Sequence, residues 1–236
     1  MLRASKAYTL HFIDKGKGFD DVYSNHTVRF KDRVHAGSLL CRELAYLKGK
    51  DALILAIARG GVIVGSAIAE CIDATLDVIV PRKIGSPYNP ELALGAVMHD
   101  GKCYINEHIA RMLSVEQGYI QSVKEERMKE SVRMLMLYRG STHYSIEGRH
   151  VVLVDDGIAT GATVLVSIAW CRDHRPASIT LAVPVMPRDV YEVMKGKVDK
   201  IVSLLLPVDF GAVGEFYEDF SPVSDEDVIN VLSKGR

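Results

Sequence analysis

The 236-residue chain lacks the features that mark membrane proteins and secreted disulfide-rich proteins. No apolar run approaches the roughly 20 residues that a bilayer-spanning helix needs. Charged residues interrupt the N-terminal stretch before a signal-peptide core can form, so we expect a cytoplasmic protein. The cysteines are few and far apart, without the short Cys-x-x-Cys spacing of zinc sites. They are Cys41, Cys71, Cys103 and Cys171, and we expect them to be reduced and mostly buried.

An excess of positive charge is also missing. Lysine and arginine total 29 against 30 aspartates and glutamates, which gives a net charge of −1. Nucleic acid is therefore not an expected partner, because its recognition depends on a surplus of basic residues that neutralise phosphates. A local basic patch would still suffice for a small phosphorylated ligand. With 48% hydrophobic and 25% charged residues, the composition is that of an ordinary globular protein.

What the sequence does contain is a regular alternation of apolar runs and helix-length segments. Such alternation is typical of an α/β protein with an open, mainly parallel sheet flanked by helices. The runs expected to form strands are 52–58, 77–80, 151–154, 179–183 and 201–206. The segments expected to form helices are 62–71, 114–138, 162–174 and 190–195. The long helix at 114–138 has a charged outer face and is interpreted as either a solvated support or a dimer arm.

Two further segments break this rhythm. Residues 96–98 and 103–105 flank a turn at Asp100-Gly101 and predict a hairpin, whereas residues 84–91 read as a long loop. The aromatic end of the chain is not periodic. We therefore expect one domain over residues 1–236, with a core at about 34–206 and a small hood built from the terminal segments 1–33 and 207–236.

Residues 151–163 (VVLVDDGIATGAT) carry the strongest chemical signal. A buried strand delivers Asp155 and Asp156 to the carboxyl edge of the sheet, where open α/β proteins bind ligands. Gly157 and Gly161 allow a tight turn, and the free N–H groups of the next helix point into that turn. Together these groups form an anion cradle suited to a phosphate monoester, with two carboxylates placed for sugar hydroxyls.

Three other interpretations of this segment are weaker. The Gly-Lys-Ser/Thr ending of a Walker phosphate loop is absent, and so is the GxGxxG spacing of a dinucleotide site. The remaining alternative is an ordinary strand–turn–helix connection in which the aspartates and threonines serve only as caps.

The segment resembles the phosphoribosyl pyrophosphate (PRPP) motif of type I phosphoribosyltransferases. In that family the paired acids hold the ribose hydroxyls and the following turn binds the 5-phosphate. The resemblance therefore implies a set of PRPP-binding residues. They are Asp155, Asp156, Gly157, Ile158, Ala159, Thr160, Gly161, Ala162 and Thr163.

Two earlier segments extend the resemblance. Ala58-Arg59-Gly60-Gly61 is similar to the family's pyrophosphate-binding loop, which implies pyrophosphate binding by Arg59, Gly60 and Gly61 and an unusual backbone conformation at Arg59-Gly60. Arg82-Lys83, followed by a polar loop, resembles the flexible catalytic loop. The catalytic set implied by the resemblance is Arg59, Arg82, Lys83, Asp155 and Asp156. Surface ion pairs are the alternative role for these three cations.

The family also implies Mg²⁺ as a cofactor that bridges pyrophosphate and sugar oxygens, with no direct metal ligand expected from the protein. More narrowly, the stretches ARGGVIVG, RKIGSPYNPELALGAV and FGAVGEFYEDFSPVSDEDV are similar to a bacterial and archaeal group of phosphoribosyltransferases whose base is unassigned. This likeness covers the chain from about residue 25 onward.

The resemblance leaves the acceptor base open. Hypoxanthine and guanine enzymes usually carry an aspartate where this chain has Ala159, which favours adenine-like bases over 6-oxopurines. Base recognition is expected from a hood over the sheet edge, where an aromatic face would stack on a flat heterocycle. The candidates are Val183, Pro184, Val185, Phe210 and Tyr217, together with Phe216 and Phe220, and plain core packing is the alternative.

The sequence therefore predicts an enzyme that moves phosphoribose from PRPP to a nitrogenous base and releases pyrophosphate. A non-catalytic regulator that binds PRPP is the alternative, and a sugar-phosphate hydrolase or phosphorylase is a third hypothesis. Such an enzyme would need a water-activating base, and no histidine or glutamate occupies a motif position to provide it. The expected partners are PRPP, a small base and, as is usual in the family, a second copy of the chain.

Overall fold

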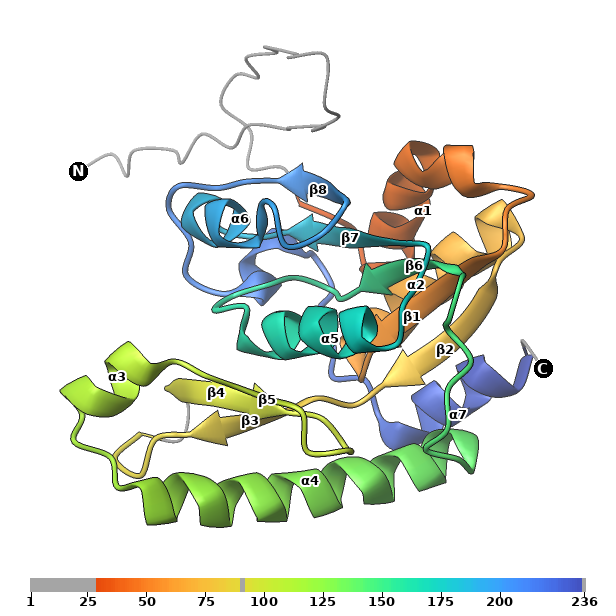
Figure 1. Cartoon of the computed structure of the whole chain (residues 1–236). Coiled ribbons are helices and arrows are strands. Elements are labelled where there is room, and N and C mark those ends of the chain that lie inside the picture. Colours follow the sequence, from red (N-terminus) through yellow and green to blue (C-terminus); the bar gives the residue numbers. More distant parts are fainter. Residues whose placement is uncertain (1–28, 90–91, 235–236) are drawn as a thin grey trace, which may run out of the picture.

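The computed structural model describes residues 29–89 and 92–234 (Figure 1). Its centre is a five-stranded sheet in the order β2-β1-β6-β7-β8, in which every neighbouring pair is parallel. The strands are β1 (Ala52–Ile57), β2 (Thr75–Ile79), β6 (His150–Val154), β7 (Ser178–Val185) and β8 (Lys200–Leu205). The predicted fold class is confirmed, because the continuous apolar runs form strands that are buried on both faces.

Helices cover both faces of this sheet (Figure 1). The alternation of side chains along β6 divides the core: Val151 and Leu153 pack in one cluster with α5 (Ala162–Asp173), and Val152 and Val154 pack in another with α1 (Arg33–Leu44) and α2 (Gly60–Ile72). The short helix α6 (Arg188–Met194) connects β7 to β8. The sheet is thus held rigidly on both sides, which fixes the loops at its carboxyl edge.

A second, smaller sheet is antiparallel and has the order β3-β4-β5. Its strands are β3 (Arg82–Gly85), β4 (Ala93–Val97) and β5 (Cys103–Ile105), followed by α3 (Glu107–Met112) and α4 (Gln117–Arg139). The predicted hairpin is confirmed, with Gly101 in the left-handed region of its turn. The prediction of a loop over residues 84–91 is wrong for its first two residues, which belong to β3. Ile84 pairs with Gly95 and is fully buried.

The end of the chain returns to the first described residues. After β8 the chain forms the short 3₁₀ helix η2 (Val213–Phe216), and Tyr217 bridges to Phe30 ahead of α1. The last helix, α7 (Asp225–Lys234), packs against α4 and α2, while η1 (Ala45–Leu47) extends α1. Most of the N-terminal part of the predicted hood, residues 1–28, lies outside the described residues. Among the described helices, none combines the length and apolar character needed to cross a membrane.

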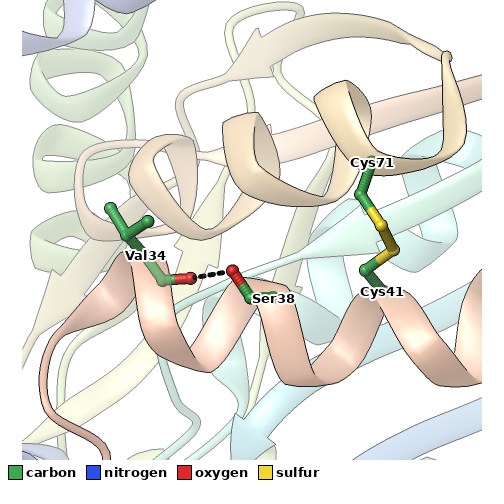
Figure 2. The surroundings of a disulfide bond; sticks show 4 residues. All are labelled: Val34, Ser38, Cys41 and Cys71. Carbon is green, nitrogen blue, oxygen red and sulfur yellow. Dashed lines mark hydrogen bonds between the residues drawn. A yellow bond between two sulfur atoms is a disulfide. The ribbon is translucent and has the colours of Figure 1, made fainter.

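The prediction that all four cysteines are reduced is wrong for two of them. A disulfide joins Cys41 on α1 to Cys71 on α2, with the Cα atoms 6.3 Å apart (Figure 2). The two helices pack side by side, which brings together cysteines that are 30 residues apart in the sequence. Cys103 and Cys171 are free, the first exposed and the second buried. Spacing along the chain therefore gave no signal for a pairing that helix packing creates.

We expect Cys71→Ser to lower the free energy of unfolding by roughly 2–4 kcal/mol, because the bridge restricts the unfolded chain between the two helices. Urea unfolding of the variant and of the oxidised wild-type protein measures the difference. Cys103→Ser, which removes an exposed free thiol, serves as the matched control and should leave the midpoint unchanged. Titration of four thiols in the unfolded, unreduced wild-type protein would contradict the bridge.

Candidate functional site

Three segments predicted to carry chemistry meet at the carboxyl edge of the large sheet. Asp155 and Asp156 follow β6, the Arg59 loop follows β1, and the segment after β2 leads into β3. A side chain in place of the Gly60 hydrogen would collide with the Asp156 carboxylate, and one at Gly61 would lie 2.7 Å from the Val154 carbonyl oxygen. The start of α2 therefore packs directly on the paired acids, and only glycine fits there.

The two carboxylates lie close together in a partly enclosed position. Burial raises the pKa of Asp155 well above its usual range, and the negative charge of Asp156 raises it further. Burial also raises the pKa of Asp156, while Arg33 opposes that shift. The backbone N–H of Asp156 donates to Oδ1 of Asp155 at 2.9 Å. Buried acids with raised pKa values are common at functional sites, which agrees with the predicted role of this pair.

Arg33 is a site residue that the sequence patterns did not single out. Its Nε donates to Oδ2 of Asp156 at 2.7 Å, and its Nη1 donates to the carbonyl oxygen of Ser221 at 2.8 Å. The guanidinium lies 3.9 Å from the centre of the Phe220 ring. Tyr217 completes the arrangement by donating its hydroxyl to the carbonyl oxygen of Asp156 at 2.6 Å.

The turn after the acids exposes a row of backbone N–H groups. Gly161, with φ of +80°, ends the turn and precedes the first residue of α5. Ile158 anchors the turn, because its N–H donates to the carbonyl of Val185 at 2.9 Å. Within the described chain, the N–H groups of residues 159–164 have no hydrogen-bond acceptor. Free N–H groups at the positive end of a helix dipole can hold an anion, and phosphate binding at this turn stays a prediction.

The predicted cations lie around the same edge and differ in their partners. Arg59 is half-exposed, follows a cis peptide bond at Ala58-Arg59, and lies 3.6 Å from Oδ1 of Asp225 on α7. The unusual backbone thus occurs one bond before the expected position. Arg82 pairs with Glu130 of α4, and burial together with neighbouring Arg127 lowers its pKa. Lys83 is exposed, and the described residues place no carboxylate within ion-pair distance of it.

A cavity of about 720 Å³ opens beside these groups. Its wall combines residues of β3, of α4 and of the start of α5. They include Arg82, Lys83, Tyr119, Val123, Arg127 and Thr163. Arg127 was not predicted, since it lies on the charged face of α4 that was interpreted as solvated. The cavity is large enough for a small phosphorylated ligand, and its wall carries three cationic side chains and one acid, Glu126. Arg82 and Arg127 both pair with Glu130.

The predicted base-binding residues are mostly buried. Val183, Pro184 and Val185 are buried in β7. Phe210 stacks on Phe216 with ring centres 5.5 Å apart, and the ring of Tyr217 packs against Phe30 and Phe220. In this arrangement the residues pack against neighbouring side chains, and both the hood and its contact with a base stay predictions.

If the predicted PRPP site is correct, Gly60→Ala should weaken PRPP binding about 10-fold, because the added methyl group displaces the Asp156 carboxylate that Arg33 holds. Titration with PRPP measures the loss. Gly118→Ala is the matched control, since the new methyl group meets nothing within 4 Å and the position is helical. That control should bind PRPP normally and gain about 0.4–1 kcal/mol of stability. Normal PRPP affinity in Gly60→Ala would contradict the close packing on Asp156.

Comparison with known proteins supports the same assignment. The sequence matches the phosphoribosyl transferase domain family over residues 33–220. A Mycobacterium tuberculosis protein named "Putative phosphoribosyl transferase" is 38% identical over 208 residues, which cover 88% of this chain and 47% of that protein. The chain thus spans about half the length of the curated relatives that it matches. The crystal structure of TT1426 from Thermus thermophilus is 37% identical, with a TM-score of 0.74 over 88% of this chain and 99% of that one.

Proposed function

Because this chain belongs to the phosphoribosyl transferase domain family, we propose that it transfers phosphoribose from PRPP to a nitrogenous base and releases pyrophosphate. One observation carries the proposal: the paired acids, the free N–H groups of 159–164 and the cation-lined cavity meet at one edge of the sheet. Each of these groups matches one part of PRPP, namely ribose hydroxyls, 5-phosphate and pyrophosphate.

In the proposed mechanism the N–H groups at the start of α5 hold the 5-phosphate, and Asp155 and Asp156 accept hydrogen bonds from the ribose hydroxyls. The sugar is then fixed with its C1 carbon toward the cavity. The bond from C1 to pyrophosphate breaks with its electron pair on the leaving oxygen, and the base nitrogen forms the new bond to C1. The proton on that nitrogen passes to solvent. Transition-state charge on pyrophosphate is stabilised by Arg59, Arg82 and Lys83.

Arg59 and Arg82 must leave their present carboxylate partners before they can bind pyrophosphate. Arg59 lies beside Asp225, and Arg82 pairs with Glu130. A pyrophosphate group carries more negative charge than either carboxylate and presents several oxygens, so it competes well for both guanidiniums. These carboxylates hold the arginines at the site until substrate arrives.

Mg²⁺ is proposed as a cofactor that enters with PRPP. The described residues contain no group of three or more histidine, cysteine, aspartate or glutamate side chains that could hold a metal ion. The donor set fits an ion carried by substrate oxygens, because Mg²⁺ keeps several waters and commonly binds through substrate phosphates. When bound, it would neutralise charge on the leaving pyrophosphate. No side chain of the chain is proposed as a direct ligand.

The proposal is tested by measuring pyrophosphate release from PRPP and Mg²⁺ over a panel of purine and pyrimidine bases. Release that depends on one base supports the transferase and identifies its acceptor, with adenine-like bases expected ahead of 6-oxopurines because Ala159 offers no carboxyl group. PRPP binding without release for any base would favour a non-catalytic PRPP-binding regulator. A folded protein that binds neither PRPP nor ribose 5-phosphate would refute the proposed function.

A further inference from the structure

Arg33 occupies a position that local rules disfavour. It is the first residue of α1, where the positive end of the helix dipole repels a cation. Its side chain is also only 9% exposed, which removes a charged group from water. An arginine in such a place needs compensation from specific partners, and residues that break local rules are often functional.

The partners of Arg33 come from two distant parts of the chain. The Asp156 carboxylate lies 2.7 Å from Nε. The carbonyl oxygen of Ser221 accepts from Nη1, and the guanidinium lies over the Phe220 ring. The salt bridge uses only Oδ2 of Asp156, and the described residues give Oδ1 no cationic partner. Arg33 therefore occupies one oxygen of Asp156, and the Asp155 side chain also hydrogen-bonds to this carboxylate.

Asp156 needs this support because of its surroundings. Its charged and titratable neighbours are Asp155 on the same turn, Arg33 on α1 and the hydroxyl of Tyr217. Lys83 on β3 also acts on Asp155. Burial favours the protonated form of Asp156, whereas hydrogen bonds from Arg33 and Asp155 favour its ionised form, and Arg33 makes the largest of these contributions. A protonated Asp156 would be a weaker acceptor for ribose hydroxyls than the carboxylate.

We propose that Arg33 is a positioning residue of the ribose site, which keeps the Asp156 carboxylate charged and fixed for a ribose hydroxyl. This inference rests on the proposed function. It also gives the segment 217–221 a role, because Phe220 and Ser221 contact Arg33 while Tyr217 hydrogen-bonds to the backbone of Asp156. Neither the motif nor the pyrophosphate loop contains Arg33, which lies 123 residues away from Asp156 in the sequence.

The test compares Arg33→Gln, Arg33→Lys and the wild-type protein. Glutamine keeps a hydrogen-bond donor of similar reach and removes the charge, whereas lysine restores the charge. Arg42→Gln is the matched control, because Arg42 is an exposed arginine in the last turn of the same helix. The measurement is the Kd of ribose 5-phosphate by calorimetry at about pH 6, 7.5 and 9, a range that lies above the ordinary carboxyl pKa.

We expect the Kd of Arg33→Gln, relative to wild type, to be about 10-fold weaker near pH 6 and to approach the wild-type value near pH 9. Loss of the guanidinium raises the pKa of Asp156, so high pH restores the carboxylate. Arg33→Lys should stay within about 3-fold of wild type at every pH, since the ammonium group supplies the missing charge. Arg42→Gln should match the wild type throughout.

A purely structural role predicts a different pattern. If the affinity of Arg33→Gln falls by the same factor at all three pH values, or if Arg33→Lys fails equally, the inference is wrong. If Arg33→Gln fails to fold, Arg33→Lys tests the inference alone. The inference then requires the affinity of Arg33→Lys for ribose 5-phosphate to stay near the wild-type value, and a clear loss would contradict it. Failure of the wild-type protein to bind ribose 5-phosphate or PRPP would refute the proposed function instead, so the two failures are distinguishable.

Discussion

Asp155→Asn is expected to lower kcat/KM for PRPP by about 10- to 150-fold, the usual cost of losing a hydrogen bond to a charged group. The same variant should raise the Tm. Asparagine keeps an oxygen for the Asp156 N–H, so the turn remains intact, but it removes a carboxylate that burial and Asp156 make costly to ionise. Loss of activity together with a gain of stability is the signature of a residue retained for function.

The pH dependence of that stability gain follows from linkage. Because the pKa of Asp155 is higher in the folded than in the unfolded protein, its contribution to stability is largest when the group is protonated. That contribution is lost as the pH rises through the folded-state pKa. The difference in unfolding free energy between Asp155→Asn and wild type should therefore be small near about pH 4 and grow toward neutral pH.

Asp73→Asn provides the matched control for the charge change. Asp73 is exposed at the end of α2, just ahead of β2 and hence at the amino edge of the sheet. Its replacement should leave PRPP turnover unchanged. If Asp155→Asn retains wild-type kcat/KM, or loses stability at neutral pH, the assignment of Asp155 to the ribose site is wrong. Pyrophosphate release and urea unfolding over the pH range supply both measurements.

The parts of the fold that the sequence predicts are those whose signal is local. The run 151–154 is wholly apolar and can only be a strand buried on both faces, and the acids that follow it must then stand at the carboxyl edge. By contrast, β3 contains Arg82, Lys83 and Gly85 and has no strand pattern of its own. It becomes a strand because β4 supplies its hydrogen bonds in register.

The residues of the candidate site also fall into those that the sequence predicts and those that it does not. Its motif residues could be found because they are contiguous, and each residue type matches one part of a sugar phosphate. Arg33, Arg127 and Asp225 could not be found, since each reaches the site through packing between elements that are distant in the sequence. The bridge between Cys41 and Cys71 was missed for the same reason. A single sequence can therefore predict a contiguous motif, whereas ion pairs between distant elements can be identified only once the fold is known.

Arg59→Ala should distinguish binding of the pyrophosphate end of PRPP from binding of its 5-phosphate end. We expect the affinity for PRPP to fall by about 10- to 150-fold, because a cation at the pyrophosphate is removed, while the affinity for ribose 5-phosphate changes by less than about 2-fold. The groups proposed to hold the 5-phosphate, the N–H groups of 159–164, do not depend on Arg59. The pair of Arg59 and Asp225 is exposed and 3.6 Å long, so its loss should cost at most about 1 kcal/mol of stability.

Arg172→Ala is the control for this variant. Arg172 lies in the last turn of α5, away from the motif, and its ion pair with Asp199 is about as exposed as the pair of Arg59 and Asp225. It should bind both ligands normally. Calorimetric titration of each protein with PRPP and with ribose 5-phosphate gives the two ratios directly. Equal losses for both ligands in Arg59→Ala would show that Arg59 supports the site as a whole. A selective loss for PRPP would place Arg59 at the leaving group, where a cation contributes to transfer and a PRPP sensor has no need of one.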